Sequence, residues 1–211
     1  MHYFFIFWIG WLVSFLGQLP LGTMSITSTQ IAVQENFKHA WRYAIGVAIV
    51  EIIYLRVTLL GVGWIIQHKL LFQILGWLTV AVFLTLGIIS FITAHKQQTE
   101  KKALLLDNNL NRFFLGLSMS ALNPAQIPFW FIWSSYLLDN KVLMSGFAEF
   151  NIFTAGCGIG TISGLALYMY GGNWLIVKMN TSTKTLNMVM GGIFVIAALA
   201  QLYRMLWGKF V

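Results

Sequence analysis

The sequence has few charged residues, and this shortage excludes an ordinary soluble domain. Only 9% of its 211 residues are charged and 58% are hydrophobic, against about 25% and about 45–50% in an average soluble domain. So few polar side chains cannot cover a water-soluble protein of this size. The shortage predicts an all-α chain in the lipid bilayer, because helices satisfy their own backbone hydrogen bonds there.

Cysteine and metal-binding patterns are also scarce. The single cysteine, Cys157, excludes an intrachain disulfide and a thiol-redox pair, and we interpret it as a small packing residue. The four histidines lie far apart in the sequence without metal-ligand spacing. We therefore expect no metal and no cofactor.

Catalytic motifs are missing too. The chain has no HExxH, no GxSxG, no paired catalytic aspartates and no phosphate-binding loop. An intramembrane enzyme acting on lipid therefore ranks below transport, although it stays as an alternative. The formal net charge is +7, but the basic residues lie at helix ends and not on one face. They indicate membrane orientation, and no nucleic-acid partner is expected.

Long uncharged stretches separate the few charges. A helix needs about 20 residues to cross a bilayer, and five charge-free stretches reach that length, as does a sixth that contains Glu51 and Arg56. The six stretches are 1–34, 40–66, 70–94, 113–138, 150–177 and 185–203. They predict six transmembrane helices.

The basic residues predict which side of the membrane each connection occupies. Most Lys and Arg residues fall in the first, third and fifth connections, near 38–42, 95–112 and 178–184. Short basic loops stay in the cytoplasm. We expect a multi-pass protein of the bacterial inner membrane with both termini on the periplasmic side.

The two halves of the chain carry matching features. A polar segment, 96–111, separates 1–95 from 112–211 and is expected to be a cytoplasmic linker. A proline interrupts the first span of each half, at Pro20 and at Pro124, and Gly46 in the second span matches Gly156. Because each half has an odd number of spans, the second copy would enter the membrane inverted. Chance similarity between apolar helices is the competing explanation.

The two proline breaks are candidate binding sites. A break leaves backbone groups unpaired, which is tolerated in a membrane where protein covers them or where they line a wet cavity. A half-helix that begins at the break directs its N–H groups and positive dipole end toward a carboxylate or another anion. A simple proline kink is the alternative. The candidate substrate-binding residues are Pro20, Gly22, Thr23, Ser25, Asn123, Pro124 and Gln126.

Glu51 is the one carboxylate deep inside a predicted span. Such a residue costs about 2.5 kcal/mol or more and usually serves a pathway, a proton relay or a buried pair. Desolvation favours its protonated form, so we expect a proton-coupling or cation-binding role. Arg56 is its candidate ion-pair partner and alternatively a ligand for a substrate carboxylate, although five residues on a helix place the two about 140° apart.

Two other patterns are interpreted as packing. Gly156, Gly160 and Gly164 form a doubled GxxxG ridge, which is typical of close contact between membrane helices. Trp130 and Trp133 lie deep in the fourth span, where lipid-facing bulk is the expected role and a cavity lining is the alternative.

Taken together, these features resemble the lysine exporter superfamily, including its homoserine and threonine exporter branch. Pro20-Leu21-Gly22 stands where that family has Pro-Gly-Pro, and Asn123-Pro124 matches its Asn-Pro. The segment from Gly46 to Glu51 resembles its Gly-x-x-x-Gly-Asp, with valine and glutamate at the last two positions. The resemblance implies six spans and export of an amino acid or similar solute, driven by the proton gradient.

The sequence therefore predicts a secondary exporter with alternating access, whose partners are a small solute, a proton and the lipid bilayer. The alternative within transport is a divalent metal-ion exporter. From other classes, the alternatives are the lipid-modifying enzyme and a non-catalytic membrane subunit. A monomer and a homodimer are both compatible with the sequence.

Overall fold

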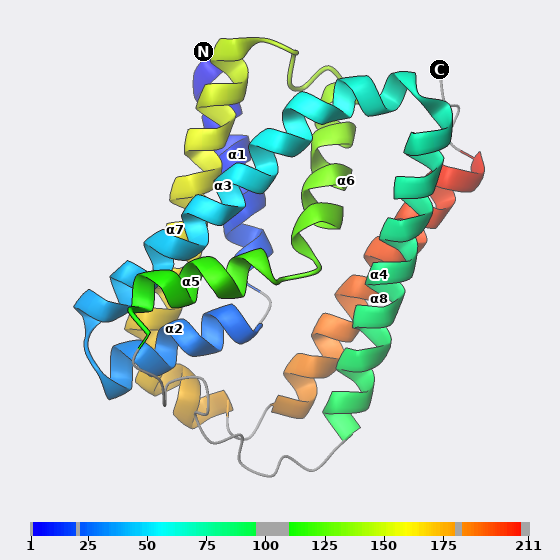
Figure 1. Ribbon diagram of the computed structural model, residues 1–211. Coiled ribbons are helices and arrows are strands. Elements are labelled where there is room, and N and C mark those ends of the chain that lie inside the picture. The colour runs from blue at the N-terminus through cyan, green and yellow to red at the C-terminus, as the bar shows by residue number, and fades with distance from the viewer. Residues whose placement is uncertain (1, 20–21, 96–109, 180–182, 208–211) are drawn as a thin grey trace.

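A computed structural model of the chain describes residues 2–19, 22–95, 110–179 and 183–207, and these form helices without strands (Figure 1). The all-α expectation is confirmed for this part of the chain. The helices are α1 (His2–Gln18), α2 (Thr23–Gln34), α3 (Phe37–Gln67), α4 (Lys69–His95), α5 (Arg112–Ala121), α6 (Gln126–Asp139), α7 (Phe147–Met179) and α8 (Thr183–Trp207).

Three helices are long and apolar enough to cross a membrane, through Phe37–Gly61 of α3, Phe72–Ile92 of α4 and Phe147–Gly171 of α7. The helices α1 and α2 pass the same test together, as a pair bent by 81°. The apolar part of α8 within the described residues, Gly191–Trp207, is shorter. The chain is a multi-pass membrane protein, and the count of six spans stays a prediction.

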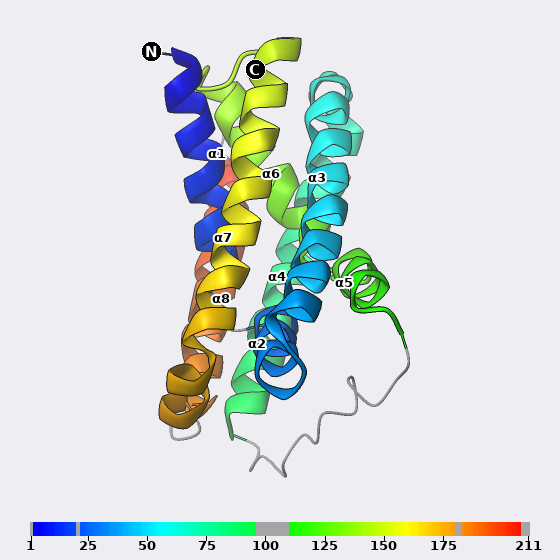
Figure 2. The same cartoon turned by 90° about the vertical axis from the view of Figure 1, so that its left-hand side faces the viewer.

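The helices form a bundle with two of them lying across it. Figures 1 and 2 show α1, α6 and α7 following the long axis of the molecule, with α3 inclined to them in Figure 1, whereas α2 and α5 run crosswise. The helices α4 and α8 pack against each other at one side of this bundle. Each crosswise helix adjoins a break in the chain, between Gln18 and Thr23 and between Ala121 and Gln126.

Glycines bring α1 and α7 into backbone contact. A Cβ on Gly10 would overlap the carbonyl oxygen of Phe153, and a Cβ on Gly156 would overlap that of Phe7. Gly160 and Gly164 continue the contact along α1. The prediction that the GxxxG ridge is a packing surface is confirmed.

A second pair of helices, α3 and α5, meets in the same way. A Cβ on Gly46 would overlap the carbonyl oxygen of Phe113, and a Cβ on Gly116 would overlap that of Tyr43. At each interface, therefore, a glycine from each helix lies against a backbone carbonyl of the other helix. Neither interface can accept even a methyl group at these positions without a shift of backbone.

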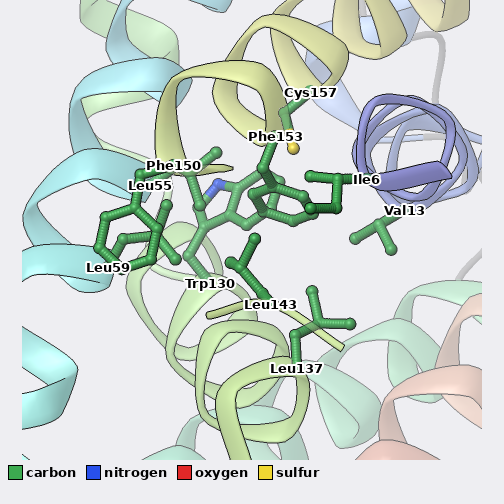
Figure 3. Close-up of a cluster of buried hydrophobic side chains, with 10 residues drawn as sticks. All are labelled: Ile6, Val13, Leu55, Leu59, Trp130, Leu137, Leu143, Phe150, Phe153 and Cys157. Carbon is green, nitrogen blue, oxygen red and sulfur yellow. The ribbon is translucent and has the colours of Figure 1, made fainter. Parts of the chain in front are cut away.

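The largest apolar cluster lies between α1, α3, α6 and α7. Figure 3 shows Trp130 at its centre, beside Leu55, Phe150 and Phe153. The Trp130 side chain is 0% exposed, so the expectation of a lipid-facing residue is wrong. In lipid, both the core and the outer surface are apolar, so hydrophobicity alone does not distinguish the two locations. Cys157 belongs to this cluster, as its interpretation as a packing residue requires.

The helices α4 and α8 make few contacts with the rest of the bundle among the described residues. Phe72 of α4, Phe131 of α6 and Met205 of α8 form an apolar cluster. Arg204 of α8 adds an ion pair of 3.0 Å with Asp139 at the end of α6. Most of the remaining packing of α4 is against α8.

Candidate functional site

Glu51 lies in the middle of α3, which packs against α7, and only 4% of its surface is exposed. Its carboxyl group is held by side chains from α1 and α7. Gln18, the last residue of α1, directs its amide nitrogen to Oε2 at 3.1 Å and to Oε1 at 3.3 Å. The Thr161 hydroxyl of α7 lies 2.6 Å from Oε2.

A fourth side chain extends this network. The Ser14 hydroxyl of α1 lies 2.7 Å from the Thr161 hydroxyl. Ser14 and Thr161 are both 0% exposed. The four side chains Ser14, Gln18, Glu51 and Thr161 form what we call the central polar cluster. Its hydrogen-bond donors are neutral groups, so none of these contacts is an ion pair.

The geometry of the central polar cluster accommodates both protonation states of Glu51. An ionised carboxylate accepts hydrogen bonds from Thr161 and Gln18. A protonated carboxyl can instead donate to the Thr161 oxygen, because the Thr161 hydroxyl has a second acceptor, the Cys157 carbonyl at 3.1 Å. Rotation of the Thr161 hydroxyl can therefore adjust the hydrogen bond when Glu51 gains or loses a proton.

The first break in the helices is covered by α7. The Tyr168 hydroxyl donates to the carbonyl of Leu19, which follows α1. The Ser25 hydroxyl donates to the Gln18 carbonyl at 3.3 Å, and Thr29 donates to the Tyr168 carbonyl at 3.0 Å. Backbone groups released by the break thus have partners within the protein, as burial in a membrane requires.

The expected binding residues of the first break have different positions. Pro20 lies outside the described residues. Gly22 is the N-cap of α2 and provides no side-chain cap, and Thr23, the first residue of α2, is exposed. Ser25 is buried and bonds the end of α1.

The second break is closed by its own side chains. The Asn123 side-chain oxygen accepts a hydrogen bond from the backbone N–H of Ala125 at 3.1 Å. Gln126 donates to the Ser120 hydroxyl at 3.1 Å, and Pro124 is an exposed residue between them in the break. Gln126 is also the first residue of α6, where free backbone N–H groups begin.

Both breaks bond to the same part of α3. At the second break, Ser120 donates to the Val47 carbonyl at 3.3 Å, and the Tyr54 hydroxyl donates to the Ala121 carbonyl at 2.8 Å. At the first break, Gln18 bonds Glu51. The structure therefore brings the two breaks to one stretch, 47–54. Among the described residues, hydrogen bonds join Glu51 directly to the first break alone.

Arg56 has partners other than Glu51. One guanidinium nitrogen donates to the side-chain oxygen of Asn151 in α7 at 2.7 Å, and the Phe147 ring lies 6.0 Å from the guanidinium carbon. The other terminal nitrogen is buried, and within the described part of the chain it has no hydrogen-bond partner. Glu51 and Arg56 thus contact different parts of α7.

The described residues contain no group of three or more His, Cys, Asp or Glu side chains placed to hold a metal ion. The central polar cluster offers one carboxylate, one amide and two hydroxyls, which is a set suited to hydrogen bonds and to a proton. The sequence comparisons indicate a transporter family. The family model of the LysE type translocator matches residues 15–205.

The chain belongs to the LysE type translocator family. The match includes both breaks, Glu51 and Arg56, so the site lies within the family region of this translocator. No curated protein and no solved structure matches the chain. Membership indicates a membrane protein that moves small solutes.

The sequence interpretation missed three members of the central polar cluster of this translocator, Ser14, Gln18 and Thr161. One signal for Thr161 was present in the sequence. Glu51 follows Gly46 by five residues, and Thr161 follows Gly156 by five residues. The match between the two glycines therefore aligns Thr161 with Glu51. Nothing in the sequence indicated that Ser14 and Gln18 would contact them.

Proposed function

We propose that this LysE type translocator is a secondary transporter that exports amino acids or similar small organic solutes across the bacterial inner membrane. Export is coupled to protons and proceeds by alternating access. The observation that carries the proposal is Glu51, a deeply buried carboxyl held by neutral donors from α1 and α7. An intramembrane carboxyl in a translocator usually belongs to the ion or substrate pathway.

The architecture in this proposal is an inverted repeat of 1–95 and 112–211, joined by the cytoplasmic linker 96–111. The glycine contacts support it, because the α1–α7 interface and the α5–α3 interface use the same spacing. The glycine follows the contacted carbonyl by three residues on each of the four helices. The four carbonyl and glycine pairs are Phe7 and Gly10, Phe113 and Gly116, Tyr43 and Gly46, and Phe153 and Gly156.

These contacts relate α1 to α5 and α3 to α7. Six spans then follow if α1 with α2 and α5 with α6 each count as one broken span. In this arrangement α1 begins and α8 ends at the same end of the molecule (Figure 1). The basic connections of the sequence place that end on the periplasmic side.

Glu51 carries the coupled proton or binds the substrate ammonium group. The hydrogen bonds of Thr161 support the first role, since its hydroxyl can donate either to Glu51 or to the Cys157 carbonyl. Gln18 supports a link to transport because it ends α1 at the first break. A change in the charge of Glu51 therefore acts on the residue where the span bends.

The substrate carboxylate binds at the two breaks. The residues proposed to line this site are Pro20, Gly22, Thr23, Ser25, Asn123, Pro124 and Gln126. The helices α2 and α6 begin just after the breaks, and their first N–H groups suit an anion. In the structure, Ser25, Asn123 and Gln126 bond to the protein, and substrate would replace these contacts.

Arg56 provides a further contact for the substrate carboxylate. Its side chain is held by Asn151 near the start of α7, while one guanidinium nitrogen lacks a partner among the described residues. A guanidinium binds carboxylates through two parallel hydrogen bonds. We place this contact between Glu51 and the periplasmic end of α3.

Counterflow in proteoliposomes tests the proposal. Labelled amino acids are offered to wild type, to Glu51→Gln and to Glu149→Gln, a matched control at a buried carboxylate that caps the start of α7. We expect proton-driven counterflow from wild type and Glu149→Gln, and its loss in Glu51→Gln. Each protein must elute as one folded species in detergent.

Four outcomes contradict the proposal. Unchanged proton-driven transport by folded Glu51→Gln removes the proposed role of that residue. Counterflow of divalent ions without any amino acid would make the chain a metal-ion exporter instead. A wild-type protein that carries no solute while it turns over lipid, or copurifies with one fixed partner, would replace transport with one of the other classes.

A further inference from the structure

The hydrogen bond between Glu51 and Thr161 joins equivalent positions of the two halves. In α3, Glu51 follows Gly46 by five residues, and in α7, Thr161 follows Gly156 by five residues. Gly46 and Gly156 make the same contact with the other half. Gly46 lies against the Phe113 carbonyl of α5, and Gly156 lies against the Phe7 carbonyl of α1. The 2.6 Å contact of Thr161 with Glu51 therefore lies where an axis relating the halves would cross α3 and α7.

The serines that adjoin this pair are equivalent as well. Ser14 follows Gly10 by four residues in α1, and Ser120 follows Gly116 by four residues in α5. Ser14 bonds Thr161, and Ser120 bonds the Val47 carbonyl, one turn before Glu51. The Ser14 hydroxyl thus lies beside α7, which carries Thr161, and the Ser120 hydroxyl lies beside α3, which carries Glu51.

From this geometry we infer that Thr161 is a positioning residue of the proton site, and that α7 can supply the carboxyl group of that site in place of α3. The inference rests on the proposed function and extends it. Both halves then contribute to the site, and the carboxyl group can stand either on α3 or on α7. A proton is the ligand, because the bonded oxygens of Glu51 already have neutral partners.

The surroundings of the pair fit an exchange of the two side chains. An exchange keeps their summed volume, which cores tolerate best. Gln18 can reach a carboxyl on either helix, because its Cβ lies against Gly164, one turn beyond Thr161, while its amide bonds Glu51. Ser14 is already within hydrogen-bond distance of position 161.

The titratable and charged groups near the pair are few. Among the described residues, the thiol of Cys157 in α7 is the titratable group that interacts with Glu51. The hydrogen-bond partners from α1 are Ser14 and Gln18, which do not titrate. A carboxyl moved to position 161 therefore keeps the same neighbours.

The experiment is an exchange of the two residues. The variants are Glu51→Thr, the exchange E51T/T161E, and the matched control E51T/T154E. Thr154 is also a buried threonine of α7, but it lies two turns away from the position equivalent to Glu51. Proton-driven counterflow is measured in proteoliposomes over a range of pH.

We expect Glu51→Thr and E51T/T154E to lose transport by at least about tenfold, the effect of one hydrogen bond to a charged group. The exchange E51T/T161E restores transport to within about tenfold of wild type and restores its pH dependence. Failure of the folded exchange variant to restore either property overturns the inference, as does equal restoration by E51T/T154E.

A second readout needs no substrate and separates this inference from the proposed function. Infrared difference spectra between two pH values report the C=O stretch of a carboxylic acid, which shifts in D₂O. We expect the signal of the buried acid in wild type, its loss in Glu51→Thr, and its return in E51T/T161E. If wild type itself carries no solute, a signal that returns in E51T/T161E supports the exchangeable proton site and overturns the transport assignment. A signal that does not return overturns the inference alone.

Discussion

The α1–α7 and α5–α3 interfaces share their packing and differ in their polar contacts. Both use a glycine from each helix against a backbone carbonyl of the other. At the first interface, Ser14 bonds the side chain of Thr161, whereas at the second, Ser120 bonds the backbone of Val47. At the two equivalent positions, α3 has the carboxyl group of Glu51 and α7 has Thr161.

The difference separates residues that build the bundle from residues that act in it. Packing glycines occur in both interfaces, because each interface must bring two backbones together. Glu51 and Gln18 have no chemical equivalent in the other half, where Thr161 and Pro124 stand near the matching positions. Residues that differ between equivalent positions of the two halves are therefore the better candidates for a role in transport.

The largest effect is expected from adding a methyl group at the matching glycines. Gly46→Ala and Gly156→Ala each force a backbone shift, which lowers the free energy of unfolding by about 1–3 kcal/mol. If the interfaces are equivalent, the two losses are similar. Thermal unfolding in detergent measures them.

Gly192→Ala is the control for both glycine variants. A Cβ at Gly192 of α8 meets nothing within 4 Å, and alanine is favoured over glycine inside a helix by about 0.5–1 kcal/mol. This variant should unfold at or above the wild-type temperature. A neutral Gly156→Ala beside a destabilised Gly46→Ala would break the comparison between the interfaces.

An effect of similar size is expected where a tyrosine covers a break. Tyr168→Phe leaves the Leu19 carbonyl without its hydroxyl partner, and Tyr54→Phe does the same to the Ala121 carbonyl. An unsatisfied buried acceptor costs about 1–3 kcal/mol. We expect the greater loss in Tyr168→Phe, because Tyr168 is buried and Tyr54 is partly exposed. Equal losses would show that the breaks are covered equally well.

The equivalent serines sharpen the comparison further. Ser14→Ala removes one hydrogen bond, whereas Ser120→Ala removes two, with Val47 and with Gln126. Each bond is worth about 0.5–1.5 kcal/mol, so we expect the larger loss of stability in Ser120→Ala. Only Ser14→Ala removes a partner of Thr161, so only this variant should shift the pH profile of transport. A shift of the same size in Ser120→Ala would contradict the assignment of the proton site.

The smallest effect is expected at the corner between α2 and α3. Burial raises the pKa of Glu35, but hydrogen bonds from Arg112 and His39 outweigh it, so the pKa lies below its usual value. A lowered folded-state pKa stabilises the protein above the unfolded pKa, and this stability is lost as the pH falls through the folded pKa. Glu35→Gln should lower stability at neutral pH by about 0.2–1 kcal/mol.

The stability of the two proteins at acid pH provides the check. The difference between wild type and Glu35→Gln should shrink as the pH falls below the usual value of a glutamate. Unfolding midpoints at several pH values measure it. A difference that grows in acid would contradict the ion pair with Arg112, whose contact is 2.6 Å.

The sequence predicted the helical class, the break between α5 and α6 at Pro124 and the packing role of the glycine ridge, because backbone chemistry determines all three. It also singled out Glu51, since a carboxyl is conspicuous in an apolar segment. It did not predict that Trp130 faces the core, because apolar residues face both lipid and protein. It did not bring Gln18 to Glu51, because that contact depends on how α1 and α3 each pack against α7.

The stretch of α3 from Val47 to Tyr54 has a mechanical consequence. Hydrogen bonds from both breaks end on these two helical turns. A bend at one break therefore displaces the anchor of the other, so the two spans cannot change shape independently. Under the proposed alternating access, we expect that opening toward one compartment disturbs the contacts needed to open toward the other, which would prevent a continuous leak across the bilayer.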